Sequence, residues 1–246
     1  MSKTTGKTAV VVLAAGRGTR MNSDKAKVLH EVLGRPMVDY VVSSASEIAG
    51  DDVVVVVGHQ AEAVRASLAD RRAVFALQEK QLGTGHAVMC ARDFIGAATR
   101  HVVILCGDVP LVKSETLRCL VEAHEIAGRA VTVLAVHFDE PTGYGRMVTA
   151  EDGRLLRIVE EKDASGKEKA IKVVNSGIYC VDAGFLFSAL DKVKSDNAQG
   201  EYYLTDIVEI AVQEGAGAGV VTGGSGREVT GVNTVNDLET VRQMLE

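Results

Sequence analysis

The sequence has no apolar stretch long enough to cross a membrane, and its first ten residues, MSKTTGKTAV, lack the pattern of a signal peptide. It also lacks an excess of positive charge, because the formal net charge is −6 and the pI is about 5.6. An acidic chain has no general attraction to nucleic acid or anionic lipid. We therefore expect neither as a partner, and an anionic ligand must be met by a local basic cluster.

Cysteine and histidine patterns typical of metal or redox sites are missing as well. Cys90, Cys106, Cys119 and Cys180 include no Cys-x-x-Cys pair, and the six histidines show no zinc-binding spacing with each other or with cysteine. We interpret the cysteines as reduced core residues of a cytoplasmic protein, and we expect no structural zinc site.

Motifs for covalent catalysis are absent too. There is no nucleophile elbow G-x-S-x-G and no protein-kinase or metalloprotease motif. This absence fits direct phosphoryl transfer, in which positioning and charge neutralisation do most of the catalysis. Repeats and polar linkers are also missing, so 246 residues with 46% hydrophobic content predict a single domain.

Strand and helix patterns alternate in the first part of the chain. Apolar runs rich in β-branched residues occur at Ala9–Leu13, Val53–Val57 and Val102–Leu105. Helical patterns lie at Met37–Ile48, Ala61–Leu68, Gly85–Phe94 and Glu115–Ile126. This alternation predicts an α/β, Rossmann-like fold, with a mostly parallel central sheet and helices on both faces. The glycines that follow the three strands, Gly16, Gly58 and Gly107, are then expected at one edge of the sheet.

The pattern changes after residue 139, where apolar runs become shorter and turns more frequent. We expect a smaller antiparallel region there, followed by helices at Thr205–Gln213 and Thr234–Leu245. Within the single domain, residues 1–246, the sequence is divided loosely into a nucleotide-binding half, about 8–140, and an acceptor half, about 141–246.

The segment VVLAAGRGTRM, residues 11–21, runs from an apolar strand into a basic glycine loop. It matches neither the Walker loop nor the dinucleotide fingerprint, because both need a glycine where Met21 stands. Glycines still let backbone N–H groups approach an anion, and Arg17, Arg20, Lys25 and Lys27 add positive charge. The segment is either a phosphate-binding loop or a turn with solvated basic residues.

Other polar residues at strand ends also have two interpretations. Asp108 is either a Mg²⁺ ligand or a turn residue, and Asn233 is either a polar ligand or the N-cap of a helix. Gln78 and Gln81 have amides suited to a base edge, or they belong to a polar loop in which Thr84 caps the next helix. Residues 197–206, NAQGEYYLTD, suit a sugar or form an exposed loop.

Taken in order, nine segments resemble the uridylyltransferase domain of bacterial N-acetylglucosamine-1-phosphate uridyltransferases: LAAGRGTRM, KVLHEVLGRPM, QEKQLGTGHAV, GDVPL, GYGRMV, IVEEKDA, NSGIY, NAQGEYYLTDI and GVNT. The resemblance runs from about Thr8 to the C-terminus. It implies a nucleotide-diphospho-sugar transferase fold and an Mg²⁺-dependent reaction. In that reaction UTP and N-acetylglucosamine 1-phosphate give pyrophosphate and UDP-N-acetylglucosamine, a precursor of peptidoglycan and lipopolysaccharide.

The resemblance also implies roles for individual residues. The positions that match nucleotide contacts are Leu13, Ala14, Ala15, Gly16, Gly18, Lys27, Gln78, Gly83, Thr84 and Asp108. Arg20 and Lys27 match the catalytic positions that neutralise the phosphates, and Asp108 and Asn233 match the Mg²⁺ ligands. The positions that match sugar contacts are Gly145, Glu160, Asn175, Tyr203 and Thr205.

Two residues depart from the family pattern. Ala26 stands where proline is usual, and Cys106 stands where tyrosine is common. Because alanine leaves the backbone more freedom than proline, we expect Ala26→Pro to tighten UTP binding.

Two other functions remain open. One is an enzyme for another nucleotide or sugar phosphate, such as dTTP or glucose 1-phosphate, and the other is a non-catalytic nucleotide-binding regulatory module. Full-length family members continue into a trimeric β-helix with acetyltransferase activity, whose hexapeptide repeat this sequence lacks. We therefore expect a monomer without acetyl-CoA-dependent activity, either a stand-alone form or one domain of a longer protein.

Overall fold

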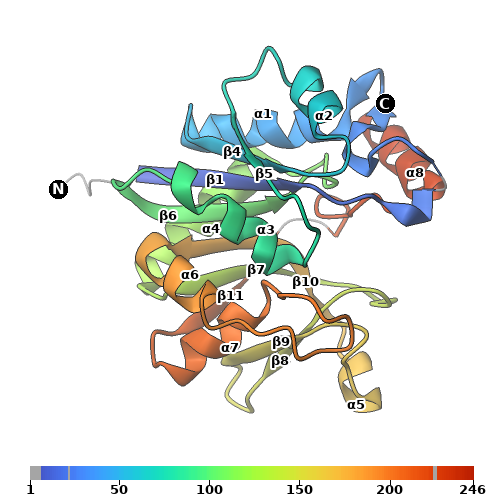
Figure 1. Cartoon of the computed structure of the whole chain (residues 1–246). Coiled ribbons are helices and arrows are strands. Elements are labelled where there is room, and N and C mark those ends of the chain that lie inside the picture. The colour runs from blue at the N-terminus through green and yellow to red at the C-terminus, as the bar shows by residue number, and fades with distance from the viewer. Residues whose placement is uncertain (1–6, 22, 224–225) are drawn as a thin grey trace.

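The fold is known from a computed structural model, which describes residues 7–21, 23–223 and 226–246 (Figure 1). Its strands are β1 (Lys7–Ala14), β2 (Glu31–Val32), β3 (Arg35–Pro36), β4 (Val53–Val57), β5 (Val74–Leu77), β6 (Thr99–Cys106), β7 (Val131–His137), β8 (Arg146–Thr149), β9 (Leu155–Val159), β10 (Val173–Asp182) and β11 (Ala218–Thr222). Its α-helices are α1 (Met37–Ala49), α2 (Ala61–Ser67), α3 (Thr84–Cys90), α4 (Ser114–Ala127), α5 (Gly166–Lys169), α6 (Ala183–Leu190), α7 (Asp206–Gln213) and α8 (Val235–Leu245). Short 3₁₀ turns lie at Thr19–Met21, Lys27–Leu29 and Arg92–Phe94.

The main sheet has the strand order β11-β7-β10-β6-β1-β4-β5. Strands β6, β1, β4 and β5 are parallel neighbours, and β11 is parallel to β7. Strand β10 runs antiparallel to both β6 and β7, and it also pairs with β8 of the antiparallel β8–β9 hairpin. The predicted mostly parallel sheet with a smaller antiparallel region is therefore confirmed.

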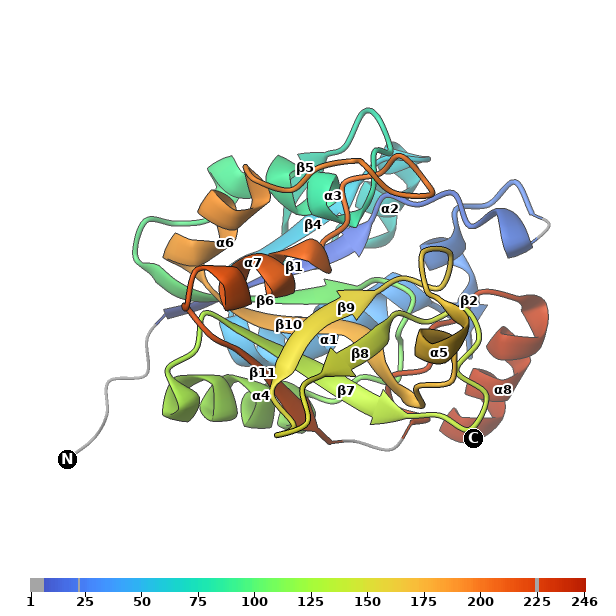
Figure 2. The same ribbon diagram turned by 90° about the horizontal axis from the view of Figure 1, so that it is seen from below.

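The apolar runs form strands because both faces of the sheet are covered by helices. Along β1, Val10 and Val12 pack with residues of α1, α2 and α4, whereas Val11 packs with residues of α3, α6 and α7. The five valines of β4 divide between the same two clusters and are all buried. A strand buried on both faces reads as a continuous β-branched run rather than an alternating one. Figure 2 shows α3, α6 and α7 on one side of the sheet and α4 on the other.

The carboxyl ends of β1, β4 and β6 meet at one edge, as predicted. The Gly107 N–H donates to the carbonyl of Leu13, and the His59 N–H donates to the carbonyl of Ala15, at 2.9 and 3.1 Å. A side chain on Gly58 would come within 2.9 Å of Ala15 Cβ. The edge is therefore too tightly packed for a larger residue at Gly58, and the space above it is lined by loops.

The C-terminal helix packs against residues from the first part of the chain. Helix α8 packs on β2, and Val241 of α8 forms a small buried cluster with Met21, Val32 and Met37 (Figure 1). The residues just before α8 are thereby brought to the nucleotide half of the sequence. The division near residue 140 stays a prediction.

Two local expectations from the sequence are wrong. The helix expected at Gly85–Phe94 ends at Cys90 and continues only as the 3₁₀ turn Arg92–Phe94. Cys119 is not a core residue, because it lies on the exposed side of α4, although its neighbour Leu120 is buried. The helical period places residues one position apart on different sides, and the sequence pattern alone did not separate them.

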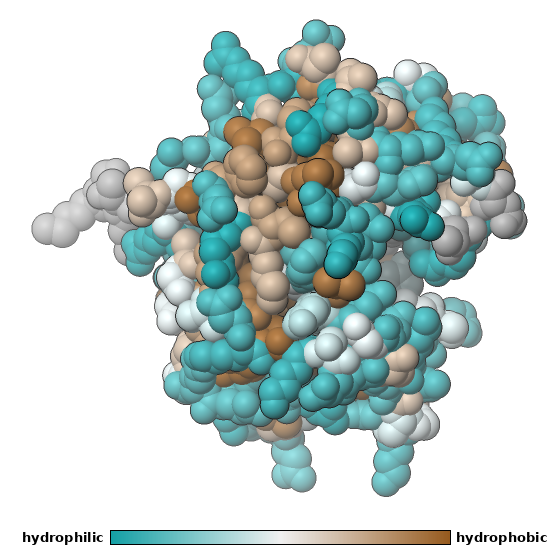
Figure 3. Space-filling view, in the orientation of Figure 1, coloured by the Kyte–Doolittle hydropathy of each residue, from teal (hydrophilic) through white to brown (hydrophobic). Residues whose placement is uncertain are grey.

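The face of the molecule that is turned to the viewer in Figure 1 has both apolar and hydrophilic regions. Figure 3 shows apolar residues gathered over the β5 and α3 region, and a mostly hydrophilic surface over α7 and β8–β9. Val74, Leu77 and Leu82 are among the exposed large apolar side chains. No helix in the described part of the chain has both the length and the apolarity needed to span a membrane.

One buried ion pair generates a stability prediction. The Arg146 side chain is 2% exposed, and its Nη2 lies 2.7 Å from Oε2 of Glu161. We expect Glu161→Ala to lower the free energy of unfolding by roughly 1–3 kcal/mol, because it leaves a buried guanidinium unpaired. Urea denaturation at pH 7 measures the change. Glu214→Ala, which breaks the exposed pair with Lys192, is the control and should cost less than about 0.5 kcal/mol.

The ion pair of Arg146 and Glu161 also makes the stability of the fold depend on pH. The hydrogen bond from Arg146 lowers the pKa of Glu161 below its ordinary value of 4.5. The carboxylate therefore stabilises the fold above pH 4.5, and this contribution is lost as the pH falls through the lower pKa of the folded protein. The difference in the free energy of unfolding between wild type and Glu161→Ala should shrink over that pH range. A difference that stays constant with pH would contradict the role of the ion pair.

Candidate active site

The glycine loop after β1 is shaped by the residues that it faces. Gly18 has φ +69°, and a Cβ there would lie 2.4 Å from Cβ of Lys27, so only glycine fits. A Cβ on Gly16 would meet nothing within 4 Å, so this position opens onto free space. The open backbone at Gly16 is suited to the close approach of an anionic ligand.

Lys27 is at the centre of a polar junction between distant parts of the chain. Its Nζ contacts Oδ2 of Asp108 closely and donates to Oδ1 of Asn233 at 3.1 Å. Arg20 Nη2 donates to the same Asn233 oxygen at 2.7 Å. Two cationic groups, one carboxylate and one amide thus converge at the carboxyl edge of the sheet. The structure brings together these four residues, which the sequence proposed separately.

Asn233 does not cap α8, so that alternative is wrong. The cap is Thr234, which forms a capping box with Asp237, and the Asn233 N–H also donates to the Asp237 carboxylate. This arrangement satisfies the start of the helix and leaves the Asn233 side chain directed to Lys27. Backbone contact between Val232 N–H and the carbonyl of Asp108, at 2.9 Å, holds the segment in place.

Two adjoining cavities lie beside this junction. One, of about 400 Å³, is lined by Gly16, Arg17, Gly18, Arg20, Lys27, Gln81 and Asn233. The other, of about 260 Å³, is lined by Leu13, Ala15, Gly16, Lys27, Val28, Gln78, Gln81, Gly83, Thr84, Ala87, Cys106, Asp108 and Glu201. Ala14 is absent from both linings because its side chain is buried in the core.

Gln78 is a buried amide whose orientation is set by its partners. Its Nε2 donates to the carbonyl of Gly83 at 3.1 Å and lies 3.0 Å from Nδ1 of His86. A carbonyl oxygen only accepts, so this contact identifies the nitrogen end of the amide. Because the amide nitrogen of Gln78 already contacts Gly83 and His86, its carbonyl oxygen is the group left to accept a hydrogen bond from a ligand.

The loop that carries Gly83 and Thr84 is fastened to the segment 201–204. Gly83 has φ +109°, and a Cβ there would come within 2.6 Å of the Tyr202 carbonyl oxygen. The Gly85 N–H donates to that oxygen, and Thr84 Oγ1 accepts from the Leu204 N–H at 3.1 Å. Thr84 therefore does not cap α3 through its side chain, as the alternative proposed. It joins the two loops instead.

Most of the predicted sugar residues also meet. A Cβ on Gly145 would lie 3.5 Å from Oε2 of Glu160 and 3.6 Å from Cβ of Asn175. Thr205 Oγ1 donates to Oε1 of Glu160 at 3.3 Å. Burial raises the pKa of Glu160, and the glycine keeps the space beside its carboxyl group open. These four residues form one group around Gly145.

Tyr203 lies beside this group, but its hydroxyl bonds to residues outside it. Its hydroxyl donates to Oδ2 of Asp163 at 3.1 Å and accepts from Gln199. Burial raises the pKa of Tyr203 to about 12, so the phenol stays protonated at neutral pH. Asp206 lines the same cavity, and its burial, with Glu209 and Asp163 nearby, raises its pKa to about 6.

Sequence reasoning missed some residues of the site. Gln60 accepts from the Ala26 N–H at 2.8 Å and donates to the Asp24 carbonyl at 2.7 Å, so it holds the segment before Lys27. Its only sequence signal is its place just after Gly58. Glu201 lines one of the cavities and was not named, although it stands inside the segment 197–206. Gln81, which the sequence analysis did name, lines both cavities.

Comparison with known proteins places this site in a family. The model of the family described as nucleotidyl transferase matches residues 9–225. A protein from Bacillus anthracis, described as a glucose-1-phosphate thymidylyltransferase and solved in complex with sucrose, shares the fold. Its TM-score is 0.77 at 21% identity, over 96% of this chain and 94% of that chain.

Closer relatives carry the name bifunctional protein GlmU. The chain is 50% identical over 229 residues to that of Geobacter metallireducens, covering 93% of this chain and 48% of the relative. For Desulfotalea psychrophila the identity is 46% over 226 residues, covering 92% and 67%. For Caldanaerobacter subterraneus subsp. tengcongensis it is 50% over 235 residues, covering 96% and 51%. The chain thus spans about half the length of most of these relatives. It belongs to the nucleotidyl transferase family, and it is related over nearly its whole length to the bifunctional GlmU proteins.

Proposed function

We propose that this protein transfers a uridylyl group from UTP to N-acetylglucosamine 1-phosphate. The observation that carries the proposal is the junction of Lys27, Arg20, Asp108 and Asn233, of which Lys27 and Asp108 line the same cavity as the buried amide of Gln78. Cations and hard oxygen ligands thus border a candidate nucleotide cavity, and the group around Gly145 is a candidate sugar site. The GlmU relatives support the same assignment.

The reaction is a single displacement at phosphorus. A phosphate oxygen of the sugar 1-phosphate forms a bond to the α-phosphorus of UTP, and the bond from that phosphorus to the bridging oxygen breaks. The bonding pair leaves with pyrophosphate, so no protein nucleophile is needed. In this arrangement Lys27 and Arg20 neutralise charge that collects on the phosphate oxygens, and Gly16 lets the backbone approach them.

Asp108 and Asn233 fit the Mg²⁺ that we propose as cofactor. Their side-chain oxygens both contact one cationic group, Nζ of Lys27, so two hard oxygen donors already converge on a positive charge. A bound Mg²⁺ would neutralise the phosphates of the reactants. When the phosphates enter, Lys27 exchanges its contacts with these two oxygens for contacts with phosphate.

The amide of Gln78 supports uracil as the base. Uracil has a donor at N3, which matches the accepting carbonyl of Gln78, whereas cytosine has an acceptor there. A mismatched base would leave two buried acceptors unpaired, at a cost of about 1–3 kcal/mol. On the sugar side, the lack of a side chain at Gly145 leaves Glu160 and Asn175 accessible, and they suit the hydroxyl and acetamido groups of the acceptor.

The site residues assigned from the resemblance remain part of this proposal. A cytoplasmic location, which the four unpaired cysteines favour, is also part of the proposal. The proposal further includes a monomeric state, which light scattering would test.

Substrate choice is tested by pyrophosphate release from the four NTPs and several sugar 1-phosphates, with Mg²⁺. We expect UTP with N-acetylglucosamine 1-phosphate to be preferred, and kcat/KM for UTP to exceed that for CTP by at least about tenfold. Gln78→Ala should narrow this ratio, whereas Gln213→Ala, on the exposed side of α7, should preserve it. Equal kcat/KM for UTP and CTP would exclude base reading by Gln78, and a preference for dTTP with glucose 1-phosphate would favour the alternative enzyme.

The role of Asp108 is tested with a variant of nearly equal shape. Asp108→Asn should keep the fold, measured by circular dichroism, and lower kcat by more than about tenfold, which corresponds to about 1.4 kcal/mol. The reason is that the site loses the only carboxylate of the junction. Asp191→Asn, on the exposed pair with Arg92, is the matched control and should keep the wild-type rate. A variant with more than a tenth of the wild-type kcat would contradict the assignment, and a protein with no turnover on any substrate pair would favour a non-catalytic module.

The structure revises the expectation for Ala26. Its φ of −53° suits proline, but its N–H donates to Gln60, and proline has no N–H. We now expect Ala26→Pro and Gln60→Ala both to weaken UTP binding by about two- to fivefold, because each removes the bond that orders the segment before Lys27. Calorimetry gives the dissociation constants, with Gln213→Ala as control. Tighter UTP binding by Ala26→Pro would instead support the expectation that reduced backbone freedom at residue 26 favours binding.

A further inference from the structure

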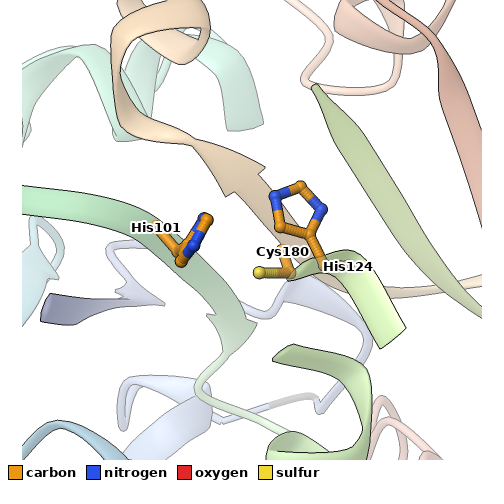
Figure 4. Close-up of side chains that lie close together, drawn as sticks. All are labelled: His101, His124 and Cys180. Carbon is orange, nitrogen blue, oxygen red and sulfur yellow. The ribbon is translucent and has the colours of Figure 1, made fainter. Parts of the chain in front are cut away.

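Two histidines and a cysteine meet at the edge of the sheet opposite to the proposed active site (Figure 4). His101 lies near the start of β6, His124 lies in the last turn of α4, and Cys180 lies on β10. The active-site residues follow the other end of β6, after Cys106. The sequence led us to expect no zinc site because these residues are far apart in the chain, but the fold places them together.

Their geometry is close to that of a metal site. The ligand atoms of the three side chains all lie within 4.8 Å of one another, and all three residues are buried. Figure 4 shows the sulfur of Cys180 pointing toward His101, with the ring of His124 beside it. Ligands of a tetrahedral zinc ion, at bond lengths of about 2.0–2.3 Å, are separated by roughly 3.3–3.8 Å. An inward movement of about 1 Å would therefore bring the three atoms to bonding positions.

Glu125, the residue after His124, lies beside the cluster but outside it. Its Oε1 lies 3.3 Å from Nε2 of His101, but it is not among the three residues whose ligand atoms all lie within 4.8 Å of one another. The donor set is therefore two imidazoles and one thiolate, which suits Zn²⁺ better than Mg²⁺. A solvent molecule would complete the tetrahedral coordination.

The hydrogen bonding of the cluster also points to a ligand. Both ring nitrogens of His101 and Oε1 of Glu125 are buried and have no hydrogen-bond partner among the described residues. The His101 side chain is only 5% exposed. His124 differs, because its Nδ1 lies 2.9 Å from Oγ1 of Thr132, which orients the ring and leaves Nε2 for a metal. Unpaired buried polar atoms are costly, and an ion at the cluster would bond to one ring nitrogen of His101.

A cavity reaches the two histidines of the cluster, and Cys180 lies behind them without lining it. A cavity of about 290 Å³ is lined by His101, His124 and Glu125 together with Arg100, Arg129 and Asp182. The two arginines oppose a cation, and the two carboxylates favour it. Burial lowers the pKa of His101, and it lowers that of His124 to about 4, so both rings are neutral at pH 7, as metal ligands must be.

We propose that His101, His124 and Cys180 bind one Zn²⁺ ion and that this ion fastens α4 to β6 and β10. On binding, the Cys180 thiol loses its proton to solvent, and the thiolate donates a lone pair to the metal. The site is independent of the phosphate chemistry, because it lies at the other end of β6.

Cobalt is a spectroscopic probe for this site. The full chain, freed of metal by a chelator and kept in excess Mg²⁺ to fill the site at Asp108, is titrated with Co²⁺. We expect one Co²⁺ per chain, with a thiolate-to-cobalt charge-transfer band, intense visible bands of tetrahedral geometry, and displacement by Zn²⁺. Saturating Zn²⁺ should raise Tm by about 2–6 °C, because it binds only the folded state.

Variants assign the thiolate. Cys180→Ser should abolish the charge-transfer band and weaken Zn²⁺ binding by at least about tenfold. Cys119→Ser, on the exposed side of the same helix that carries His124, should keep both. If Cys180→Ser does not fold, His101→Gln takes its place, and it should weaken binding equally. The proposal is overturned if the wild-type protein shows no charge-transfer band, or if the band persists in Cys180→Ser or is lost in Cys119→Ser.

Discussion

The structure depends on the burial of both faces of its central strands. Because helices cover β1, β4 and β6 on each side, the central residues of these strands are apolar, and polar side chains gather toward the strand ends. The parallel direction of the three strands then brings their carboxyl ends to one edge. The loops at this edge carry Gly16, Gly58 and Asp108, so the position of the candidate active site follows from how the hydrophobic core is built.

At that edge, charge balance organises the polar groups. Lys27 lies between Asp108 and Asn233, and Arg20 reaches the same amide from the glycine loop. The cations and their oxygen partners pair with one another, so the junction leaves none of these charges unpaired. Under the proposed function, anionic phosphates and a divalent cation would each find partners of the appropriate sign among the same groups.

Backbone contacts between loops set the relative position of the two cavities. The Tyr202 carbonyl accepts from Gly85, and Thr84 accepts from Leu204, so the loop next to the base-reading amide is joined to the segment that leads to Thr205. Thr205 in turn contacts Glu160 in the group around Gly145. A short chain of hydrogen bonds therefore links the loop next to Gln78 with that group. Gln60 holds the segment before Lys27 by accepting from the Ala26 N–H.

The sequence by itself determined the layered α/β fold, because strands buried on both faces must be continuous β-branched runs and covering helices must be amphipathic. Val53–Val57 was predicted to the residue for this reason, and the glycine-rich segments located the edge with the ligand cavities. The alternatives for single polar side chains were settled by the three-dimensional packing. Thr84 begins α3 and Asn233 lies two residues before α8, and sequence spacing cannot separate a cap from a residue that faces a distant loop. His101, His124 and Cys180 stand far apart in the chain, and their meeting depends on strand order and on the packing of α4, which local patterns do not specify.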